Sequence, residues 1–306
     1  MQTDPVKGQT KKAIIIGGPT ASGKTSLAID VAKHFHTSII SCDSRQCYRE
    51  MNIGVAKPSP AELAQVPHYF INSHSILEPV NAAFFEQYAL QRAAEIFRTS
   101  GELVMVGGTG LYIKAFTEGM DHIPVIDPGI RNHIIDQFEK NGLKWLQEQV
   151  EQKDPLYFST GEIHNPQRLM RALEVKLGTG LSIREFQKQS TIQRDFNIYK
   201  FAINIEREKL VENINTRVDQ MIANGLVEEV KDLLEYRHLP ALQTVGYQEL
   251  FEYFDGKCSL DEAIDRIRIN TRQYAKRQMT WFRKHGFQWV HAGDVKHIID
   301  TVSKTH

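Results

Sequence analysis

The sequence predicts an α/β fold, a parallel sheet flanked by helices with an inserted all-helical lobe. In the first third of the chain, short β-branched apolar runs alternate with segments of helical spacing, which is typical of a parallel sheet. Between residues 118 and 199 the chain becomes polar and helical, and a strand-like run then returns. That order predicts a discontinuous core, residues 1–117 and 200–306, around an insertion at residues 118–199.

The first strand, Ala13–Ile16, leads into a stretch that fits the phosphate-loop pattern G-x-x-x-x-G-K-[ST], and Ser26–Ala32 then opens a helix. In such a loop the backbone N–H groups and the helix N-terminus point at phosphate oxygens. The strand before and the helix after favour this interpretation over an ordinary glycine turn. The core is therefore predicted to be P-loop NTPase-like and to bind a diphosphate or polyphosphate. Its expected binding residues are Gly18, Pro19, Thr20, Ala21, Ser22, Gly23, Lys24 and Thr25, with the Thr25 hydroxyl placed to ligate Mg2+.

The remaining elements follow in order. Further strands are expected at residues 37–41, 103–106 and 199–205, and core helices at 84–97 and 210–222. In the insertion, Asp127-Pro128 reads as a helix start, and breaks are expected at 141–142, 154–155, 165–166 and 178–180. The rest of the chain is predicted to be mostly helical, with breaks at 224–225 and 255–256.

Polar side chains follow three of these strands, namely Thr20 with Lys24, Asp43, and Thr109. The carboxyl ends of parallel strands meet in one crevice, so we expect these side chains to converge. Asp43 can hold Mg2+ or accept a proton from an attacking nucleophile, or it can simply cap a helix that follows it. The glycines around Thr109 can equally form only a tight turn.

Basic residues are unevenly distributed. The segment 266–284 holds seven Lys or Arg and no acidic residue, among them Arg272, Lys276 and Arg277. It is either a solvated helix face or a surface for a polyanion such as nucleic acid. Arg168 and Arg171 share a helix face, where they can contact phosphate or pair with Glu174.

The bulk composition limits the classes of function. The 37 basic and 37 acidic residues cancel in a chain of 306, so any site for a polyanion must be a local patch. Three cysteines without metal-ligand spacing, and 12 histidines without a zinc pattern, favour a reduced, cytoplasmic compartment and make zinc chemistry unexpected. The N-terminal residues 1–8 are polar and no apolar run approaches 18 residues, so neither a signal peptide nor a membrane span is expected.

Eight blocks, in order along nearly the whole chain, resemble the bacterial-type tRNA dimethylallyltransferases (tRNA isopentenyltransferases). The phosphate loop alone indicates only a superfamily, whereas the ordered set indicates this family. The blocks are Gly18–Thr25, Ser41–Tyr48, Asn52–Pro58, Pro67-His68, Val106–Tyr112, Asn165–Val175, Val245-Gly246-Tyr247 and Thr271–Phe282.

The resemblance implies transfer of a dimethylallyl group from dimethylallyl diphosphate to the exocyclic N6 amine of the adenosine 3′ of the anticodon, with release of diphosphate. It implies that Asp43 is the general base, and that Thr20 and Arg217 belong to the catalytic set. The phosphate loop and Arg217 would bind the diphosphate together with Mg2+. An aromatic amine is a poor nucleophile, so a carboxylate that takes its proton fits this chemistry.

The resemblance also implies that tRNA is the macromolecular partner and that the insertion is the lobe that grips it. A cytoplasmic monomer without a membrane association is the expectation. The residues expected to contact tRNA are Asp43, Ser44, Arg45, Gln46, Thr109, Arg131, Gln167, Arg168, Leu169, Met170, Arg171 and Gly246, together with Arg272, Lys276 and Arg277 of the basic segment.

Two positions depart from the family pattern. Val55 stands where the Gly-Thr-Ala-Lys-Pro block has Thr, and Cys47 replaces a hydrophobic residue. Two other functions use parts of the same pattern. A small-molecule or nucleotide kinase would use the phosphate loop with ATP, but it requires a second acidic strand end, and the third strand ends in Gly-Gly-Thr. A non-catalytic RNA-binding switch would account for the basic segment alone.

Overall fold

A computed structural model describes residues 10–187 and 192–304 of the chain. It divides into two compact units, a core unit formed by residues 1–118 and 193–306, and a helical unit formed by residues 119–192. The sequence placed the insertion at 118–199. Residues 197–199 instead lie in the core unit, because they begin a strand that pairs with the first strand of the sheet. The N-terminal residues 1–8, on which the signal-peptide expectation rests, lie outside the described residues.

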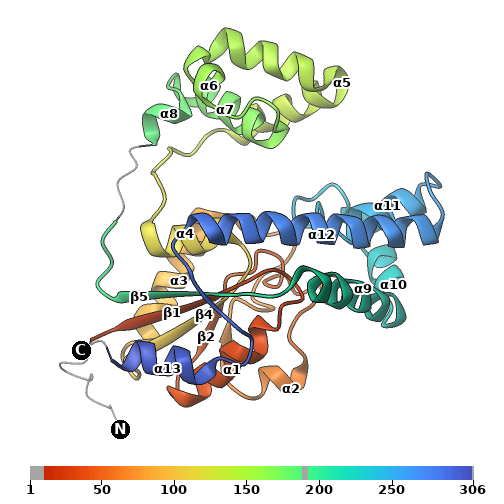
Figure 1. Ribbon diagram of the computed structural model, residues 1–306. Helices are drawn as coiled ribbons and strands as arrows, with labels where there is room; N and C mark the ends of the chain where they lie inside the picture. The colour runs from red at the N-terminus through yellow and green to blue at the C-terminus, as the bar shows by residue number, and fades with distance from the viewer. Residues whose placement is uncertain (1–9, 188–191, 305–306) are drawn as a thin grey trace. The chain divides into compact units, whose positions relative to one another are not determined.

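The core unit holds a parallel sheet with the strand order β3-β2-β4-β1-β5-β6 among the described residues. The strands are β1 (Lys12–Gly17), β2 (Ile39–Ser41), β3 (His68–Tyr69), β4 (Glu102–Gly107), β5 (Asn197–Ile203) and β6 (Gln288–Val290). Figure 1 shows β5, from the second segment of the core unit, running beside β1 from the first. The predicted α/β fold with a parallel sheet is confirmed.

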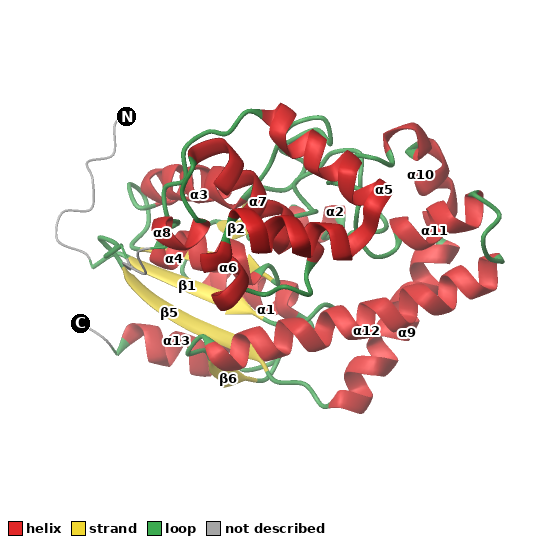
Figure 2. Ribbon diagram, turned by 90° about the horizontal axis from the view of Figure 1, so that it is seen from above, coloured by secondary structure: helices red, strands yellow, loops and turns green. Residues whose placement is uncertain are grey.

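Helices from both segments of the core unit accompany the sheet, whose strands are drawn in yellow in Figure 2. The first segment of the core unit contributes α1 (Lys24–His34), α2 (Pro60–Leu63), α3 (Ala82–Ile96) and α4 (Gly110–Glu118). The second contributes α9 (Arg207–Ala223), α10 (Leu226–Asp232), the 3-10 turn η1 (Leu234–Tyr236), α11 (Tyr247–Phe254), α12 (Leu260–Lys284) and α13 (Val295–Ser303).

Strand β1 is buried along its whole length, which is why it reads as a continuous apolar run rather than an alternating one. Ile14 and Ile16 pack into a cluster with residues of α1 and α13, including Leu27 and Ile298. Burial of such side chains contributes about 1.5–3 kcal/mol each to folding. This packing fixes β1, and with it the loop that leaves its carboxyl end.

Three details of the predicted strands are corrected. The second strand begins at residue 39 rather than 37, and the fourth spans 197–203 rather than 199–205. Strands β3 and β6 were not predicted, and the last part of the chain is therefore not purely helical. Both are two or three residues long, which is too short for a periodic pattern in the sequence to reveal.

The helical unit contains α5 (Pro128–Lys153), α6 (Pro155–Thr160), α7 (Pro166–Thr179) and α8 (Ile183–Phe186). Each of the first three begins with Pro after an Asp or Asn whose side chain caps the helix, as the sequence predicts. The expected break at 141–142 is a kink within α5, where Gly142 has φ of 74°. The core of this unit is an apolar cluster that includes Ile134, Leu146 and Leu173.

Candidate active site

The phosphate loop connects β1 to α1. Its last residue has a left-handed backbone conformation, which few residue types adopt. Gly23, immediately before α1, has φ of 85°, where glycine avoids the steric cost of a Cβ. Because Gly23 has no side chain, it also leaves the first N–H groups of α1 without a side-chain cap. Uncapped N–H groups and the positive end of the helix dipole together form an anion-binding site.

Helix α9 supports the phosphate loop from the side. Arg217 donates from Nη1 to the Thr20 hydroxyl at 3.1 Å. One turn earlier, Asn213 donates from Nδ2 to the carbonyl of Ala21 at 3.0 Å. Sequence reasoning left Arg217 without a distinguishing signal of its own, and only the fold shows that its helix lies against the loop.

Lys24 points back into the phosphate loop, where its Nζ donates to the carbonyl of Pro19 at 3.2 Å. Burial and the nearby Arg217 guanidinium lower the pKa of Lys24 to about 8, while the Asp43 carboxylate acts in the opposite direction. Burial also lowers the pKa of Arg217, again opposed by Asp43. Two cations and one carboxylate therefore share one electrostatic environment, and an incoming anion would stabilise both cations.

Asp43 lies in a turn directly after β2 and does not cap a helix. Its Oδ1 accepts the backbone N–H of Arg45 at 2.9 Å and that of Gln46 at 3.3 Å. Because both bonds use Oδ1, the other carboxylate oxygen is the one available to accept a proton or bind a metal. The turn thus holds the carboxylate in a fixed orientation at the edge of the sheet.

Thr109, after β4, is joined to the Asp43 turn. The Ser44 N–H donates to Thr109 Oγ1 at 3.1 Å, and the Thr109 hydroxyl donates to Ser44 Oγ at 3.4 Å. Tyr274 of α12 lies beside this pair, and its burial raises the pKa of its phenol to about 12. The glycines that flank Thr109 make close packing possible, since a Cβ at Gly110 would lie 2.4 Å from the Trp281 ring.

The loop at residues 52–58 forms another wall of the site. Glu229 of α10 accepts three successive backbone N–H groups, those of Asn52, Ile53 and Gly54, at 2.9, 2.8 and 3.0 Å. Tyr247 of α11 donates its hydroxyl to the same carboxylate at 2.6 Å. Gly54 must be glycine here, because a Cβ would lie 2.5 Å from the Tyr247 ring.

This loop in turn orients Gln46 and contains Val55. Gln46 donates from Nε2 to the carbonyl of Ala56 at 3.0 Å and to that of Val55 at 3.4 Å. Lys57 donates to the carbonyl of Tyr48 and to the side-chain oxygens of Asn52 and Asn72. The hydrogen bond that Val55 accepts here is a backbone one, which Thr or Val supplies equally.

These loops line an open cavity of about 1080 Å3 within the core unit. Its lining brings together side chains from the phosphate loop, the Asp43 turn, the 52–58 loop, α9 and α12. The predicted site residues in this lining are Thr20, Ala21, Ser22, Gly23, Lys24, Thr25, Asp43, Ser44, Arg45, Gln46, Arg217, Gly246 and Arg277. Five segments that are distant in sequence therefore converge. Of the three strand-end groups expected to meet, Thr20 with Lys24 and Asp43 line the cavity, whereas Thr109 does not line it and is joined to it through Ser44.

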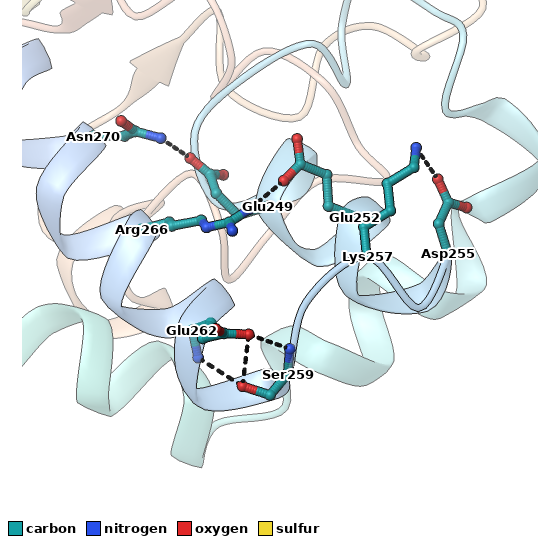
Figure 3. A network of polar contacts seen from close by, with 8 residues as sticks. All are labelled: Glu249, Glu252, Asp255, Lys257, Ser259, Glu262, Arg266 and Asn270. Carbon is teal, nitrogen blue, oxygen red and sulfur yellow. Dashed lines mark hydrogen bonds and ion pairs between the residues drawn. The ribbon is translucent and has the colours of Figure 1, made fainter.

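Gly246 is held at this cavity by a polar network between α11 and α12. Glu249 is buried, and it accepts the Gly246 N–H at 2.7 Å and Asn270 Nδ2 of α12 at 2.6 Å. Figure 3 shows the Glu249–Asn270 bond and the adjacent ion pair between Arg266 and Glu252, at 2.7 Å. The network fixes α11 against α12, and so holds both helices at the cavity.

The basic residues of α12 either join this helix to neighbouring helices or are exposed to solvent. Arg266 pairs with Glu252 of α11, and Arg268 pairs with Asp219 of α9 and with Asp265 of its own helix, so both arginines join α12 to a neighbouring helix. Arg272 donates to Asn215 Oδ1 of α9 at 3.2 Å, so it joins two helices. Of the remaining predicted contacts, Lys276 and Arg277 are exposed, and Arg277 lines the cavity.

The other predicted tRNA contacts belong to the helical unit. Arg131 and Arg171 both pair with Glu174, at 3.3 and 2.8 Å, whereas Arg168 pairs with Glu162 at 3.1 Å. Arg131 also donates to Gln167 Oε1 at 3.0 Å. The pairing alternative considered for Arg171 is therefore realised in the structure.

Two other residues of the predicted tRNA-contact set lie in the interior of the helical unit. Leu169 and Met170 are buried in the apolar core of the helical unit. Their side chains stabilise helix α7 rather than form its surface, since a 3.6-residue period turns them away from Arg168 and Arg171. The contact with tRNA expected of these two residues stays a prediction, and the structure shows only that their side chains are buried.

Sequence reasoning missed several residues that build the cavity, namely Lys57, Glu229, Tyr247, Tyr274 and Gln278. Lys57, Tyr247, Tyr274 and Gln278 stand inside quoted blocks, yet their residue types carry no chemical signal. Glu229 lies in an amphipathic helix among other acids, where nothing in the local pattern distinguishes it. Their roles depend on partners that are distant in the chain.

Comparison with known protein families places this arrangement in context. The family model described as "IPP transferase" matches residues 46–285. A tRNA dimethylallyltransferase from Christiangramia forsetii is 48% identical over 271 residues, which cover 89% of this chain and 90% of that protein.

Two solved structures have the same fold. The full-length tRNA isopentenylpyrophosphate transferase from Bacillus halodurans superimposes with a TM-score of 0.68 at 35% identity, covering 96% of this chain and 95% of the other. A eukaryotic dimethylallyltransferase described as acting on tRNA gives a TM-score of 0.75 at 25% identity, covering 96% of this chain and 77% of the other.

Proposed function

This chain belongs to the IPP transferase family, and on that premise we propose that it is a tRNA dimethylallyltransferase. It would transfer a dimethylallyl group from dimethylallyl diphosphate to the exocyclic N6 amine of the adenosine 3′ of the anticodon in tRNA. Diphosphate would be released. The names of its relatives and the structural likeness to a dimethylallyltransferase acting on tRNA support this reaction. One observation of the chain itself carries it furthest. A single cavity contains a phosphate loop with Lys24 and Arg217, and the carboxylate of Asp43 beside them.

The cationic half of the cavity suits the departing diphosphate. As the bond between the allylic carbon and the diphosphate oxygen breaks, negative charge accumulates on the leaving group. The N–H groups of α1, the Lys24 ammonium and the Arg217 guanidinium are already in place to stabilise that charge. Thr20 accepts from Arg217, so its own hydroxyl proton is free to be donated to a phosphate oxygen.

The carboxylate half suits the acceptor. The N6 amine attacks the allylic carbon, forming the N–C bond, and the proton it loses passes to Asp43. The Asp43 turn leaves one carboxylate oxygen for this proton, since the backbone N–H groups of Arg45 and Gln46 occupy the other. Gln46, whose amide donates to the 52–58 loop, would help to orient the target adenine.

We also propose Mg2+ as the metal. Among the described residues no cluster of three or more His, Cys, Asp or Glu is placed to hold a metal ion by itself. The Thr25 hydroxyl, which lines the cavity, fits the mode in which Mg2+ is bound by few protein ligands together with phosphate oxygens and water. When bound, Mg2+ would add positive charge at the leaving diphosphate.

For tRNA we propose that the helical unit and the basic residues at the cavity bind the anticodon arm. Arg131, Arg168 and Arg171 lie on the surface of the helical unit, and Arg277 lines the cavity of the core unit. A target base must leave the stacked loop to reach Asp43, so a protein that modifies it needs contacts on both the base and the backbone.

We further propose that the protein is a cytoplasmic monomer. Its three cysteines are free, as is usual in a reducing compartment. No helix among the described residues combines the length and apolar character needed to cross a bilayer. Size-exclusion chromatography with light scattering would test the oligomeric state, and a dimer mass would contradict the monomer.

The decisive experiment combines purified protein, Mg2+, radiolabelled dimethylallyl diphosphate and an unmodified anticodon stem-loop RNA. Label is expected in the RNA, and the same stem-loop with guanosine in place of the target adenosine should remain unlabelled. Absence of label, with phosphorylation of a small acceptor by ATP instead, would replace this function with that of a kinase.

A further inference from the structure

Gln278 of α12 forms a bridge between two loops of the cavity. Its side chain is buried, with 6% of its surface exposed. The Thr20 backbone N–H donates to Gln278 Oε1 at 2.9 Å, and Gln278 Nε2 donates to the Gly108 carbonyl at 3.0 Å. Thr20 lies in the phosphate loop after β1, and Gly108 lies in the loop after β4. One side chain thus joins the ends of two neighbouring strands.

The residue type and its surroundings match this bridge. One loop presents an N–H and the other a carbonyl, and a primary amide is the side-chain group that satisfies both at once. Glu would lack the donor, and Asn would be one methylene shorter. At Gly108 a Cβ would lie 2.0 Å from Gln278 Nε2, so the amide reaches the carbonyl only because that residue is glycine.

The rest of the α12 face is pressed equally closely onto the strand ends. A Cβ at Gly17 would lie 2.3 Å from the Phe282 ring, and one at Gly110 would lie 2.4 Å from the Trp281 ring. Side-chain packing thus fixes the height of α12 above the sheet. Within that packing, Gln278 supplies the polar contacts that fix the two loops laterally.

We propose that Gln278 is a positioning residue that sets the separation between the loop for the diphosphate donor and the loop for the acceptor base. The inference rests on the proposed function. On one side the bridge holds Thr20, whose hydroxyl is bonded to Arg217. On the other side it holds Gly108, whose neighbour Thr109 is bonded to Ser44 beside Asp43.

Transfer between two bound substrates depends strongly on that separation. The reacting atoms must approach within about 3–3.5 Å, and a misplacement of about 1 Å can cost about 100-fold in rate. Gln278 touches neither proposed reacting group directly, so its loss should lower turnover while leaving the tRNA-binding surfaces intact.

The test compares the wild type with Gln278→Met, which keeps the length and burial of the side chain and removes both hydrogen bonds. We expect kcat to fall about 10- to 100-fold, with the stem-loop Kd within about twofold of the wild type. Gln91→Met, at an exposed position of α3, is the matched control and should retain wild-type kcat. A Gln278→Met enzyme with lower thermal stability but wild-type kcat would reduce Gln278 to a packing residue and overturn the proposal.

Gly108→Ala tests the same bridge from its other end. Its added methyl group displaces the Gln278 amide, so Gly108→Ala should lower kcat, and the double variant with Gln278→Met should be no slower than the slower single variant. Losses that multiply in the double variant would mean that the two residues act separately. If Gln278→Met does not fold, the kcat of Gly108→Ala tests the proposal in its place.

Inorganic diphosphate separates this proposal from the proposed function. Calorimetric titration should show diphosphate binding to the wild type, and about tenfold weaker binding to Gln278→Met, because the unbridged phosphate loop is no longer held in place. If the wild type transfers no prenyl group but this difference persists, the function fails and the bridge stands. Equal diphosphate binding and equal kcat in the wild type and Gln278→Met would refute the role of Gln278 and leave the proposed function unaffected.

Discussion

Arg217 of α9 and Thr20 of the phosphate loop are joined by a hydrogen bond of 3.1 Å from the guanidinium to the hydroxyl. The bond links a helix from the second segment of the core unit to the loop that ends the first strand. Arginine only donates, so Thr20 accepts from it and keeps its proton for a ligand. The diphosphate of the proposed reaction would therefore meet two adjacent donors.

Replacing Arg217 by Ala should therefore impair use of the diphosphate donor. We expect kcat/KM for dimethylallyl diphosphate to fall by about 100-fold or more, the usual loss for a donor that stabilises developing charge. Arg217→Lys should recover only part of this loss, because an ammonium lacks the fixed fork of the guanidinium. Steady-state kinetics with each substrate varied in turn measures the effect. A change confined to the stem-loop KM would show that Arg217 serves the RNA instead.

Removing the Asp43 carboxylate should abolish the proton acceptor. Asp43→Asn retains an oxygen for the N–H groups of Arg45 and Gln46, so the turn should persist. We expect kcat to fall by about 100- to 10,000-fold in Asp43→Asn and Asp43→Ala, with stem-loop affinity nearly unchanged. Single-turnover rates and a filter-binding assay measure the two quantities. Near-normal turnover in Asp43→Asn would refute the general-base role.

Exposed arginines that contact RNA should contribute to the salt dependence of binding. Arg168→Ala and Arg277→Ala are each expected to weaken stem-loop binding and to reduce the slope of log K against log salt by roughly one unit. Arg266→Ala, which removes an ion pair between α11 and α12, is the control and should leave the slope unchanged. The measurement is a titration at several salt concentrations. Unchanged slopes for Arg168→Ala and Arg277→Ala would identify both side chains as solvated bystanders.

Lys57 should make stability depend on pH above neutrality. Burial lowers the pKa of Lys57 from 10.5 to about 8 in the folded protein. Between pH 8 and 10.5 the unfolded chain therefore keeps a proton that the folded protein has released, so this lysine's contribution to the free energy of unfolding rises with pH. We expect the stability of the wild type relative to Lys57→Met to increase across that window and to stay constant below it. Urea unfolding at several pH values measures the difference, and a flat profile would contradict the lowered pKa.

Glu229 should be important for the 52–58 loop. Its carboxylate accepts three backbone N–H groups and the Tyr247 hydroxyl, so Glu229→Ala leaves four donors without their partner. We expect a loss of about 3 kcal/mol in the free energy of unfolding, and about 1 kcal/mol for Tyr247→Phe. Glu228→Ala, at the exposed neighbouring position, should have little effect. Equal stabilities for Glu228→Ala and Glu229→Ala in urea unfolding would refute the role of this carboxylate.

The local pattern of the chain was enough to predict the elements that are long or carry a motif. Several correctly predicted features depend only on residues that are close together in sequence. They are the phosphate loop, the strand before it, the helix starts at Asp127-Pro128 and Asn165-Pro166, and the kink at Gly142. Strands β3 and β6 escaped prediction because two or three residues show no period, and they form only when a neighbouring strand offers its hydrogen bonds.

The phosphate loop, the parallel sheet and the ordered blocks of the family are properties of neighbouring residues, and the amino-acid sequence was therefore enough to predict them. Only the tertiary structure decided that Gln278 joins Thr20 to Gly108, that Glu229 holds residues 52–54, and that Leu169 and Met170 belong to a core. Each of these depends on which distant segments the packing of apolar faces brings together. A buried amide or carboxylate acquires its role from the unpaired N–H and carbonyl groups that it meets there.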